Sequence, residues 1–287
     1  MSRIQEILKK AERDGAVHRT RALGADLPTA GTSGAGAAAL AMPMHAMSTS
    51  APAVEPVEAT PVAVRLDHRL VSALAPQSPA AEQYRSLRTR IKNAEHGRTL
   101  RSIVVTSPNK GDGKSLTAAN LALAMAQDFQ QRVLLVDGDL RRPAIHHLFG
   151  ISDSPGLADV LTGAASLDDA LVAVADHHLS VLPSGPTSSH PAELLGSIAM
   201  RRTLDALRTR YDRIIIDMPP VAPLADVSIA LGMVDGLLMI VRAGVTPKPA
   251  IERALAGLDT NKVVGLVLND AGDGASSYLG GYHYVAG

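Results

Sequence analysis

The stretch SIVVTSPNKGDGKSLTAANLALAM, residues 102–125, decides the fold. It starts with a short apolar run, passes through a glycine-containing loop with GDGKS at 111–115, and continues directly into a strongly helical segment. In such a loop the glycines let successive backbone N–H groups turn inward, and the positive end of the following helix points at the same place. Strand, glycine loop and helix in this order therefore indicate a site for a nucleotide's phosphates rather than a structural turn.

The side chains of this loop are of the types with which a P-loop binds a nucleotide and its magnesium ion. The Lys114 ammonium can reach the β and γ phosphates, and the Ser115 hydroxyl can ligate magnesium. The strict motif has glycine five positions before Gly113, where this chain has Pro108. The residues expected to contact ATP are Gly111, Asp112, Gly113, Lys114, Ser115 and Leu116.

Five more short apolar runs follow the first, with helical patterns between them. Continuous apolar runs indicate strands buried on both faces, and helical crossovers between them indicate a mostly parallel, doubly wound sheet of the α/β class. Ligands of such sheets bind at the carboxyl ends of the strands. The predicted strands are 102–107, 133–139, 179–185, 213–217, 236–242 and 263–269.

Polar side chains follow these strands where the ligand is expected. VLLVDGD supplies Asp137 and Asp139, and RIIID supplies Asp217. We expect Asp139 and Asp217 to coordinate magnesium, directly or through water, and Asp137 to be available as a general base, although the roles of Asp137 and Asp139 can be exchanged. A strand-end aspartate can also cap the loop that follows it. Asn269, at the end of the last predicted strand, has both an adenine contact and a turn role open to it.

Composition excludes several function classes. The 287 residues include 28 Lys plus Arg and 28 Asp plus Glu, so net charge gives no reason to expect bulk attraction to nucleic acid or an anionic membrane. Cysteine is absent, which excludes disulfides and cysteine metal sites. The first residues lack the apolar stretch of a secretory signal, and no run approaches the roughly 18 to 20 apolar residues of a membrane span. We expect a cytoplasmic protein that reaches the membrane only through a partner.

The pattern along the chain divides it into four parts. Residues 1–23 have apolar positions at helical spacing among charges, which predicts a small amphipathic helix. Residues 24–76 are rich in Ala, Pro and Gly and are expected to form a linker. The P-loop domain is expected over 77–270, beginning with a helix over 79–95, and a Gly/Tyr-rich tail over 271–287.

The last ten residues, YLGGYHYVAG, contain three of the five tyrosines of a chain that has two Phe and no Trp. The glycines around Tyr278, Tyr282 and Tyr284 rule out a packed core. A tyrosine that accepts a phosphoryl group must leave its own domain and enter another active site, which suits a segment too glycine-rich to pack. The alternative is a tail whose tyrosines have no acceptor role.

These motifs together resemble the bacterial tyrosine autokinases of capsule and exopolysaccharide export, the BY-kinases. The resemblance covers roughly residues 77–287, and the N-terminal SRIQEILKKAER is similar to a subgroup from exopolysaccharide loci. It rests on the tyrosine tail and on six segments in order: EQYRSLRTR, SPNKGDGKS, VLLVDGDLRRP, GLADVLTG, PAELLGS and IIIDMPP.

The resemblance implies a cytosolic kinase that transfers the γ-phosphoryl group of ATP to tyrosines in its own tail or a neighbour's. It also implies a separate membrane activator, a polysaccharide co-polymerase. The family's ring-forming motif E-x-x-R-x-x-R falls on Glu82, Arg85 and Arg88, which implies self-association. A solvated helix face is the alternative for these three residues.

Two departures from the family pattern leave other functions open. Lys110 stands where the family usually has proline, and the tail has three tyrosines, fewer than many relatives have. ATPases of division and chromosome partition carry a signature lysine at the position of Asn109, so Lys110 does not count as that signature. Such an ATPase, a nucleotide-driven positioning switch, is one alternative, although those proteins commonly end in an amphipathic membrane helix. An ATP-binding regulatory scaffold with little kinase activity is another.

Overall fold

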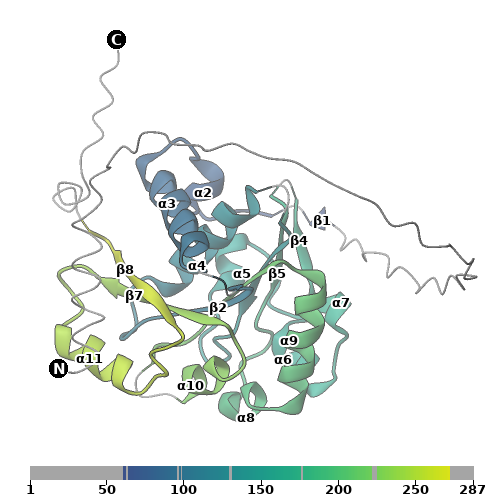
Figure 1. Ribbon diagram of the computed structural model, residues 1–287. Helices are drawn as coiled ribbons and strands as arrows, with labels where there is room; N and C mark the ends of the chain where they lie inside the picture. Colours follow the sequence, from purple (N-terminus) through teal and green to yellow (C-terminus); the bar gives the residue numbers. More distant parts are fainter. Residues whose placement is uncertain are drawn as a thin grey trace, which may run out of the picture.

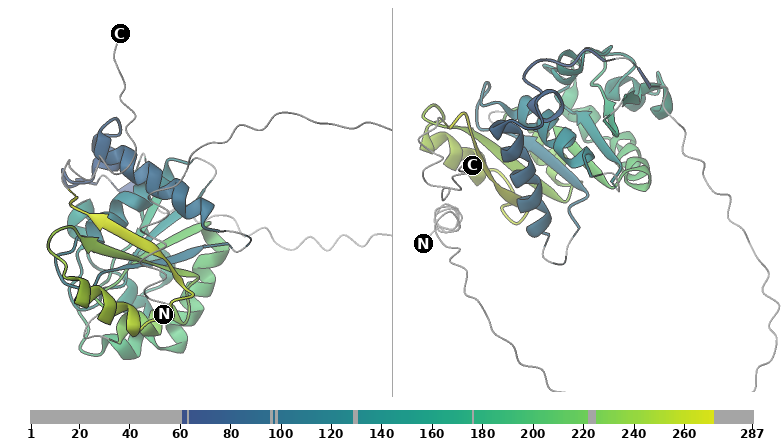
Figure 2. Two further views of the ribbon diagram at one scale, coloured as in Figure 1. Left: turned by 60° about the vertical axis from the view of Figure 1, so that its left-hand side comes forward. Right: turned by 90° about the horizontal axis from the view of Figure 1, so that it is seen from above.

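The computed structural model describes residues 61–62, 64–95, 97, 99–128, 131–175, 177–221 and 225–271 (Figure 1). The predicted N-terminal helix, most of the predicted linker, and Tyr278, Tyr282 and Tyr284 lie outside these residues. The described part contains one sheet with helices on both faces, as the left view of Figure 2 shows.

All six predicted strands are present, and the mostly parallel, doubly wound sheet is confirmed. They are β2 (Ser102–Thr106), β3 (Val133–Asp137), β5 (Leu179–Leu182), β6 (Arg213–Asp217), β7 (Gly236–Arg242) and β8 (Val263–Asn269). Three of them end before the predicted residue, so that Ser107, Asp139 and Gly185 lie in the loops that follow. These loops carry the polar groups of the ligand edge.

Two short strands at one edge were not predicted. β1 (Pro61–Val62) pairs in parallel with β4 (Val172–Val174), and β4 pairs antiparallel with β5. Runs of two and three residues are too short to show a strand pattern in the sequence. The order across the sheet is β1-β4-β5-β3-β6-β2-β7-β8, which places β2 between β6 and β7 near its centre.

Two apolar cores lie on opposite faces of the sheet. Ile103 and Val105 of β2 face one core and Val104 faces the other, because successive strand residues point to opposite faces. The helices on the side of the first core are α2 (Val71–Leu74), α3 (Pro79–Asn93), α4 (Lys114–Ala126) and α5 (Ile145–Phe149). The second is covered by α6 (Leu157–Thr162), α7 (Leu167–Ala170), α8 (Pro191–Leu195), α9 (Ile198–Arg210), α10 (Asp226–Leu231) and α11 (Lys248–Ala256).

Helix α3 ends two residues earlier than the predicted 79–95. Its first turn is fixed by Ser78, whose side chain accepts a hydrogen bond from the Ala81 N–H, and by Pro79 at the first helical position. Its apolar stripe includes Ile91, which is buried in the core that α4 also fills. The start and inner face of this helix therefore follow from its sequence.

Residues 64–76 pack on the domain, although the sequence analysis assigned them to the linker. Leu70 is fully buried. The Asn120 side chain of α4 accepts from the Ser72 N–H at 3.0 Å and donates to the Arg69 carbonyl at 3.1 Å. The Gln127 side chain donates to the Ser72 carbonyl at 2.8 Å. The folded domain therefore begins before residue 77, since a distant helix supplies partners that local composition does not reveal.

Truncating Leu70 tests this boundary. We expect Leu70→Ala to lower the free energy of unfolding by about 2 to 5 kcal/mol, because it opens a cavity in a packed core. Leu74, four residues away and 52% exposed, is the matched control, and Leu74→Ala is expected to change that free energy by less than about 0.5 kcal/mol. Urea unfolding of both variants provides the measurement. Equal, small effects of the two substitutions on the free energy of unfolding would indicate that residues 64–76 belong to the linker.

Candidate active site

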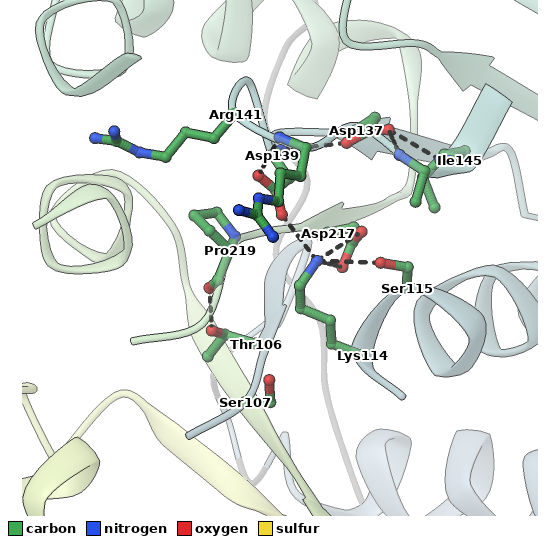
Figure 3. Close-up of polar contacts among 12 residues, drawn as sticks. Thr106, Ser107, Lys114, Ser115, Asp137, Asp139, Arg141, Ile145, Asp217 and Pro219 are labelled. Carbon is green, nitrogen blue, oxygen red and sulfur yellow. Dashed lines mark hydrogen bonds and ion pairs between the residues drawn. The ribbon is translucent and has the colours of Figure 1, made fainter. Parts of the chain in front are cut away.

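The predicted site forms at the carboxyl ends of β2, β3 and β6 (Figure 3). Strands β3 and β6 are neighbours, and their register pairs Asp137 with Asp217. Strand β2 pairs with the other side of β6 and leads through the glycine loop into α4, whose first residue is Lys114. Parallel strands thus bring together residues that lie about a hundred positions apart in the chain.

The centre of the site is an ion cluster around Lys114. Its ammonium lies 3.0 Å from an Asp139 carboxylate oxygen and 3.4 Å from an Asp217 carboxylate oxygen. It also lies 3.1 Å from the Ser115 hydroxyl. Burial alone would lower the pKa of Lys114, but the charges of Asp217 and Asp139 outweigh it and raise that pKa. The lysine therefore stays cationic, which is the state that attracts phosphate.

Asp137 is held by backbone donors. One of its carboxylate oxygens accepts from the Ala144 and Ile145 N–H groups, both at 2.9 Å, and the other accepts from the Asp139 N–H at 3.2 Å. Burial, reinforced by the charge of Asp217, raises the pKa of Asp137 to about 7. Burial also raises the pKa of Asp217, with Lys114 opposing it. Asp137 thus fixes the loop that presents Asp139 to Lys114.

The glycine loop leaves backbone donors at the start of α4. Gly113 precedes the helix in the left-handed region with φ of 94°, and Gly111 has φ of 89°. The first N–H groups of a helix have no partner within it, so they are available to an anion. Leu116 packs against the core on the α4 side of the sheet.

The donor set suits magnesium in the presence of phosphate. Ser115, Asp139 and Asp217 offer only oxygen, the ligand that Mg²⁺ prefers. Among the residues that the structure describes, no group of three or more His, Cys, Asp or Glu side chains is arranged to hold a metal ion. Mg²⁺ commonly takes one or two carboxylates and completes its shell with phosphate oxygens and water, so this site fits a metal that arrives with its nucleotide.

Comparison with known proteins agrees with this geometry. A family model described as an AAA domain matches residues 100–256, more than half of the chain. The tyrosine-protein kinase YwqD of Bacillus subtilis (strain 168) is 38% identical over 207 residues, covering 71% of this chain and 87% of that protein. The putative tyrosine-protein kinase CapB of Staphylococcus aureus is 31% identical over 213 residues, covering 73% and 92%.

The chain belongs to the bacterial tyrosine-protein kinase family. It is a protein-tyrosine kinase, and the resemblance that its motifs indicated is confirmed. Among solved structures, that of the chimerical protein CapA2B2 has a TM-score of 0.68 and 32% identity, covering 73% of this chain and 92% of that one. The BceF tyrosine kinase domain has a TM-score of 0.63 and 34% identity, covering 69% and 81%.

Two predicted nucleotide contacts of the kinase have side chains that point to the protein itself. The Asp112 carboxylate accepts from the Asn109 N–H at 2.9 Å and from the Thr246 hydroxyl at 2.7 Å. The Asn269 amide nitrogen donates to the Asp112 carbonyl at 3.0 Å. The adenine contact expected of Asn269 therefore stays a proposal.

Arg141 has a partner that the sequence did not reveal. Its guanidinium lies 2.8 Å from the carboxylate of Asp226, the fully buried first residue of α10. This hydrogen bond raises the pKa of Arg141. In Figure 3 the Arg141 side chain extends away from Lys114. The pair joins the loop after β3 to the helix after β6, and Asp139 and Asp217 lie in that loop and at the end of β6.

The ring motif of the kinase makes contacts within its own chain. Arg85 donates to Glu82 at 2.7 Å on the same helix, whereas Arg88 donates to the Ala124 carbonyl of α4 at 2.7 Å. Arg88 therefore holds α3 against the helix that carries Lys114. Contacts of Glu82, Arg85 and Arg88 with another subunit stay a prediction.

The two glycines of the loop provide a paired test. A Cβ on Gly113 would lie 2.1 Å from the Asn269 amide nitrogen, whereas a Cβ on Gly111 would meet nothing within 4 Å. Both substitutions carry the left-handed strain of about 1 to 2 kcal/mol, and only Gly113→Ala adds a collision. We expect Gly111→Ala to retain most of its affinity for a fluorescent ATP analogue, and Gly113→Ala to lose at least about tenfold.

A melting curve of each glycine variant shows whether it remains folded. Equal affinities of the two variants would contradict the expected collision between a Cβ at position 113 and the Asn269 side chain.

Proposed function

We propose that this kinase transfers the γ-phosphoryl group of ATP to Tyr278, Tyr282 and Tyr284 of neighbouring copies of itself. The observation that carries the proposal is the cluster of Lys114, Asp139 and Asp217 beside Ser115 at one edge of the sheet. A cation, two carboxylates, a hydroxyl and a helix N-terminus are the groups that hold and activate a nucleotide triphosphate.

The residues divide the work by their chemistry. The backbone N–H groups of residues 111–116 bind phosphate oxygens, and Lys114 adds a positive charge between the β and γ phosphates. Ser115, Asp139 and Asp217 hold Mg²⁺, which neutralises charge that develops on the phosphates. Asp137 is the proposed general base for the tyrosine proton, because it lies beside Asp217 at the ends of β3 and β6 and burial raises its pKa to about 7.

Transfer to the tail also explains how the kinase can regulate its assembly. An unmodified tyrosine is neutral near pH 7, since its free pKa is about 10. A phosphotyrosine carries about 1.5 to 2 negative charges and is repelled by a site that contains Asp137, Asp139 and Asp217. We propose that unmodified tails dock in neighbouring sites, that Glu82, Arg85 and Arg88 join the subunits into a ring, and that phosphorylation releases the tails.

The partner we propose is a membrane polysaccharide co-polymerase that recruits the kinase to the inner face of the cell membrane and activates it. Among the described residues, no helix has the length and apolar character needed to cross a bilayer. The putative tyrosine-protein kinase EpsB of Ralstonia nicotianae matches over only 23% of its length, so in that protein the kinase region is part of a longer chain. Control of exopolysaccharide polymerisation and export is the role proposed for the pair.

Incubation with labelled ATP and magnesium tests the transfer. We expect label on the tail of the full chain, and a loss of about a hundredfold or more in Lys114→Met, because the variant loses the charge that stabilises the transferring phosphoryl group. A chain with Tyr278, Tyr282 and Tyr284 changed to Phe should bind ATP yet accept no label. Label retained by that variant would place the acceptor elsewhere.

The same assay separates Asp137 from Asp139. Asp137→Asn should slow transfer without loss of magnesium-dependent nucleotide binding, whereas Asp139→Asn should weaken that binding. The opposite pattern would exchange their roles. Absence of label even with the membrane partner present would favour the positioning ATPase or the regulatory scaffold.

Light scattering of the full chain before and after incubation with ATP and magnesium tests the assembly. We expect a large species that shrinks once the tail is phosphorylated, because charge repulsion removes the tails from neighbouring sites. The Lys114→Met variant is the control and should stay large. An oligomer that keeps its size despite confirmed tail phosphorylation would contradict the release mechanism.

A further inference from the structure

Asp112 is an acidic residue inside a loop that binds phosphates. Its side chain is almost fully buried, with 2% of the residue exposed. A carboxylate directed at the triphosphate would repel it, and a buried carboxylate is costly unless donors satisfy it. Its position therefore calls for a function other than nucleotide contact.

Both carboxylate oxygens of Asp112 receive hydrogen bonds from the protein. One accepts from the Asn109 N–H at 2.9 Å, which closes the loop on itself. The other accepts from the Thr246 hydroxyl at 2.7 Å, in the turn between β7 and α11. The Thr246 oxygen in turn accepts from the Arg242 N–H at 2.9 Å. The hydroxyl thus joins the end of β7 to the nucleotide loop.

A second contact supports the same part of the loop. The Asn269 amide donates to the Asp112 carbonyl at 3.0 Å, and the carbonyl of Asn269 accepts from the Ala243 N–H at 2.8 Å. The adjacent Asp270 pairs with Arg242 at 2.9 Å. The ends of β7 and β8 therefore form one hydrogen-bonded group that supports Asp112, and we call this group the platform. Its members are Arg242, Thr246, Asn269 and Asp270.

We propose that Asp112 is a positioning residue, which with Thr246 holds the nucleotide loop in the curvature that directs its N–H groups toward ATP. The proposal rests on the nucleotide site proposed above and assigns the Asp112 side chain to the support of that site, whereas its backbone N–H remains among the groups that bind phosphate. The same platform ends at Asp270, one residue before the predicted tail begins. Asn269 of β8, the strand that precedes the tail, thus contacts the nucleotide loop directly.

Thr246 provides the sharpest test because its shape can be kept while its hydroxyl is removed. Thr246→Val loses the hydrogen bond to Asp112, and Thr246→Ser retains it. We expect Thr246→Val and Asp112→Ala each to raise the KM for ATP about tenfold and to lower kcat, because a misplaced loop weakens contacts in both the bound and the reacting state. Thr246→Ser should stay within about twofold of the unmodified chain.

Asp112→Asn is expected to fall between Asp112→Ala and the unmodified chain. Its amide keeps one acceptor for the Asn109 N–H and presents a donor to Thr246, whose hydroxyl oxygen can accept it. The matched control is Thr209→Val in the last turn of α9, where the hydroxyl donates to the Ala206 carbonyl at 2.7 Å. This control should leave both kinetic constants unchanged.

The double variant Asp112→Ala/Thr246→Val distinguishes one unit from two independent effects. Residues that act through one hydrogen bond give a double variant no worse than the more damaging single change. Multiplied losses, or a Thr246→Ser enzyme as impaired as Thr246→Val, would overturn the positioning role.

Binding of a fluorescent ATP analogue to the full-length protein is measured in parallel. An unmodified chain that does not bind it would overturn the nucleotide site itself, whereas normal binding and kinetics in every Asp112 and Thr246 variant would overturn the positioning proposal alone.

Discussion

The attraction between the Lys114 ammonium and the carboxylates of Asp139 and Asp217 is the interaction on which the site depends. Only a parallel sheet with β2, β6 and β3 side by side brings these three residues within 3.0 to 3.4 Å. The side chains of Lys114, Asp139 and Asp217 are 12%, 5% and 0% exposed. Because charges so far removed from water are costly alone, each of the three is stabilised by its opposite charge in the cluster. The fold thus concentrates charge at the carboxyl ends of β3 and β6 and at the start of α4.

The sequence predicted the parts of this arrangement that follow from continuous patterns. Six apolar runs predicted six strands, because buried parallel strands need apolar residues on both faces. The positions of Lys114, Asp139 and Asp217 at the ends of predicted strands and loops then predicted that they meet, since the carboxyl ends of parallel strands share one edge. The order of strand, glycine loop, GKS and helix, with acidic residues after two other strands, predicted which side chains come together, and the family motifs predicted the enzyme class.

The parts that the sequence did not reveal depend on partners far along the chain. Asp112 lies among predicted nucleotide contacts, but its partner Thr246 is 134 positions away. Leu70 lies in an Ala/Pro-rich segment, and the Asn120 side chain that fixes its neighbours comes from another helix. Arg141 and Asp226 are 85 positions apart. No periodicity encodes such side-chain pairs, and the two-residue strand β1 gives no pattern at all.

Helix α4 has one end in the nucleotide site and the other against α3, where Arg88 bonds to the Ala124 carbonyl and Lys92 pairs with Asp128 at 2.7 Å. A helix of 13 residues is about 20 Å long and scarcely compresses. Because Arg88 and Lys92 bond at the end of α4 remote from Lys114, this one helix connects the outer helix α3 to the centre of the ion cluster. A substitution on the inner face of α3 can therefore displace Lys114 through α4 without touching the site itself.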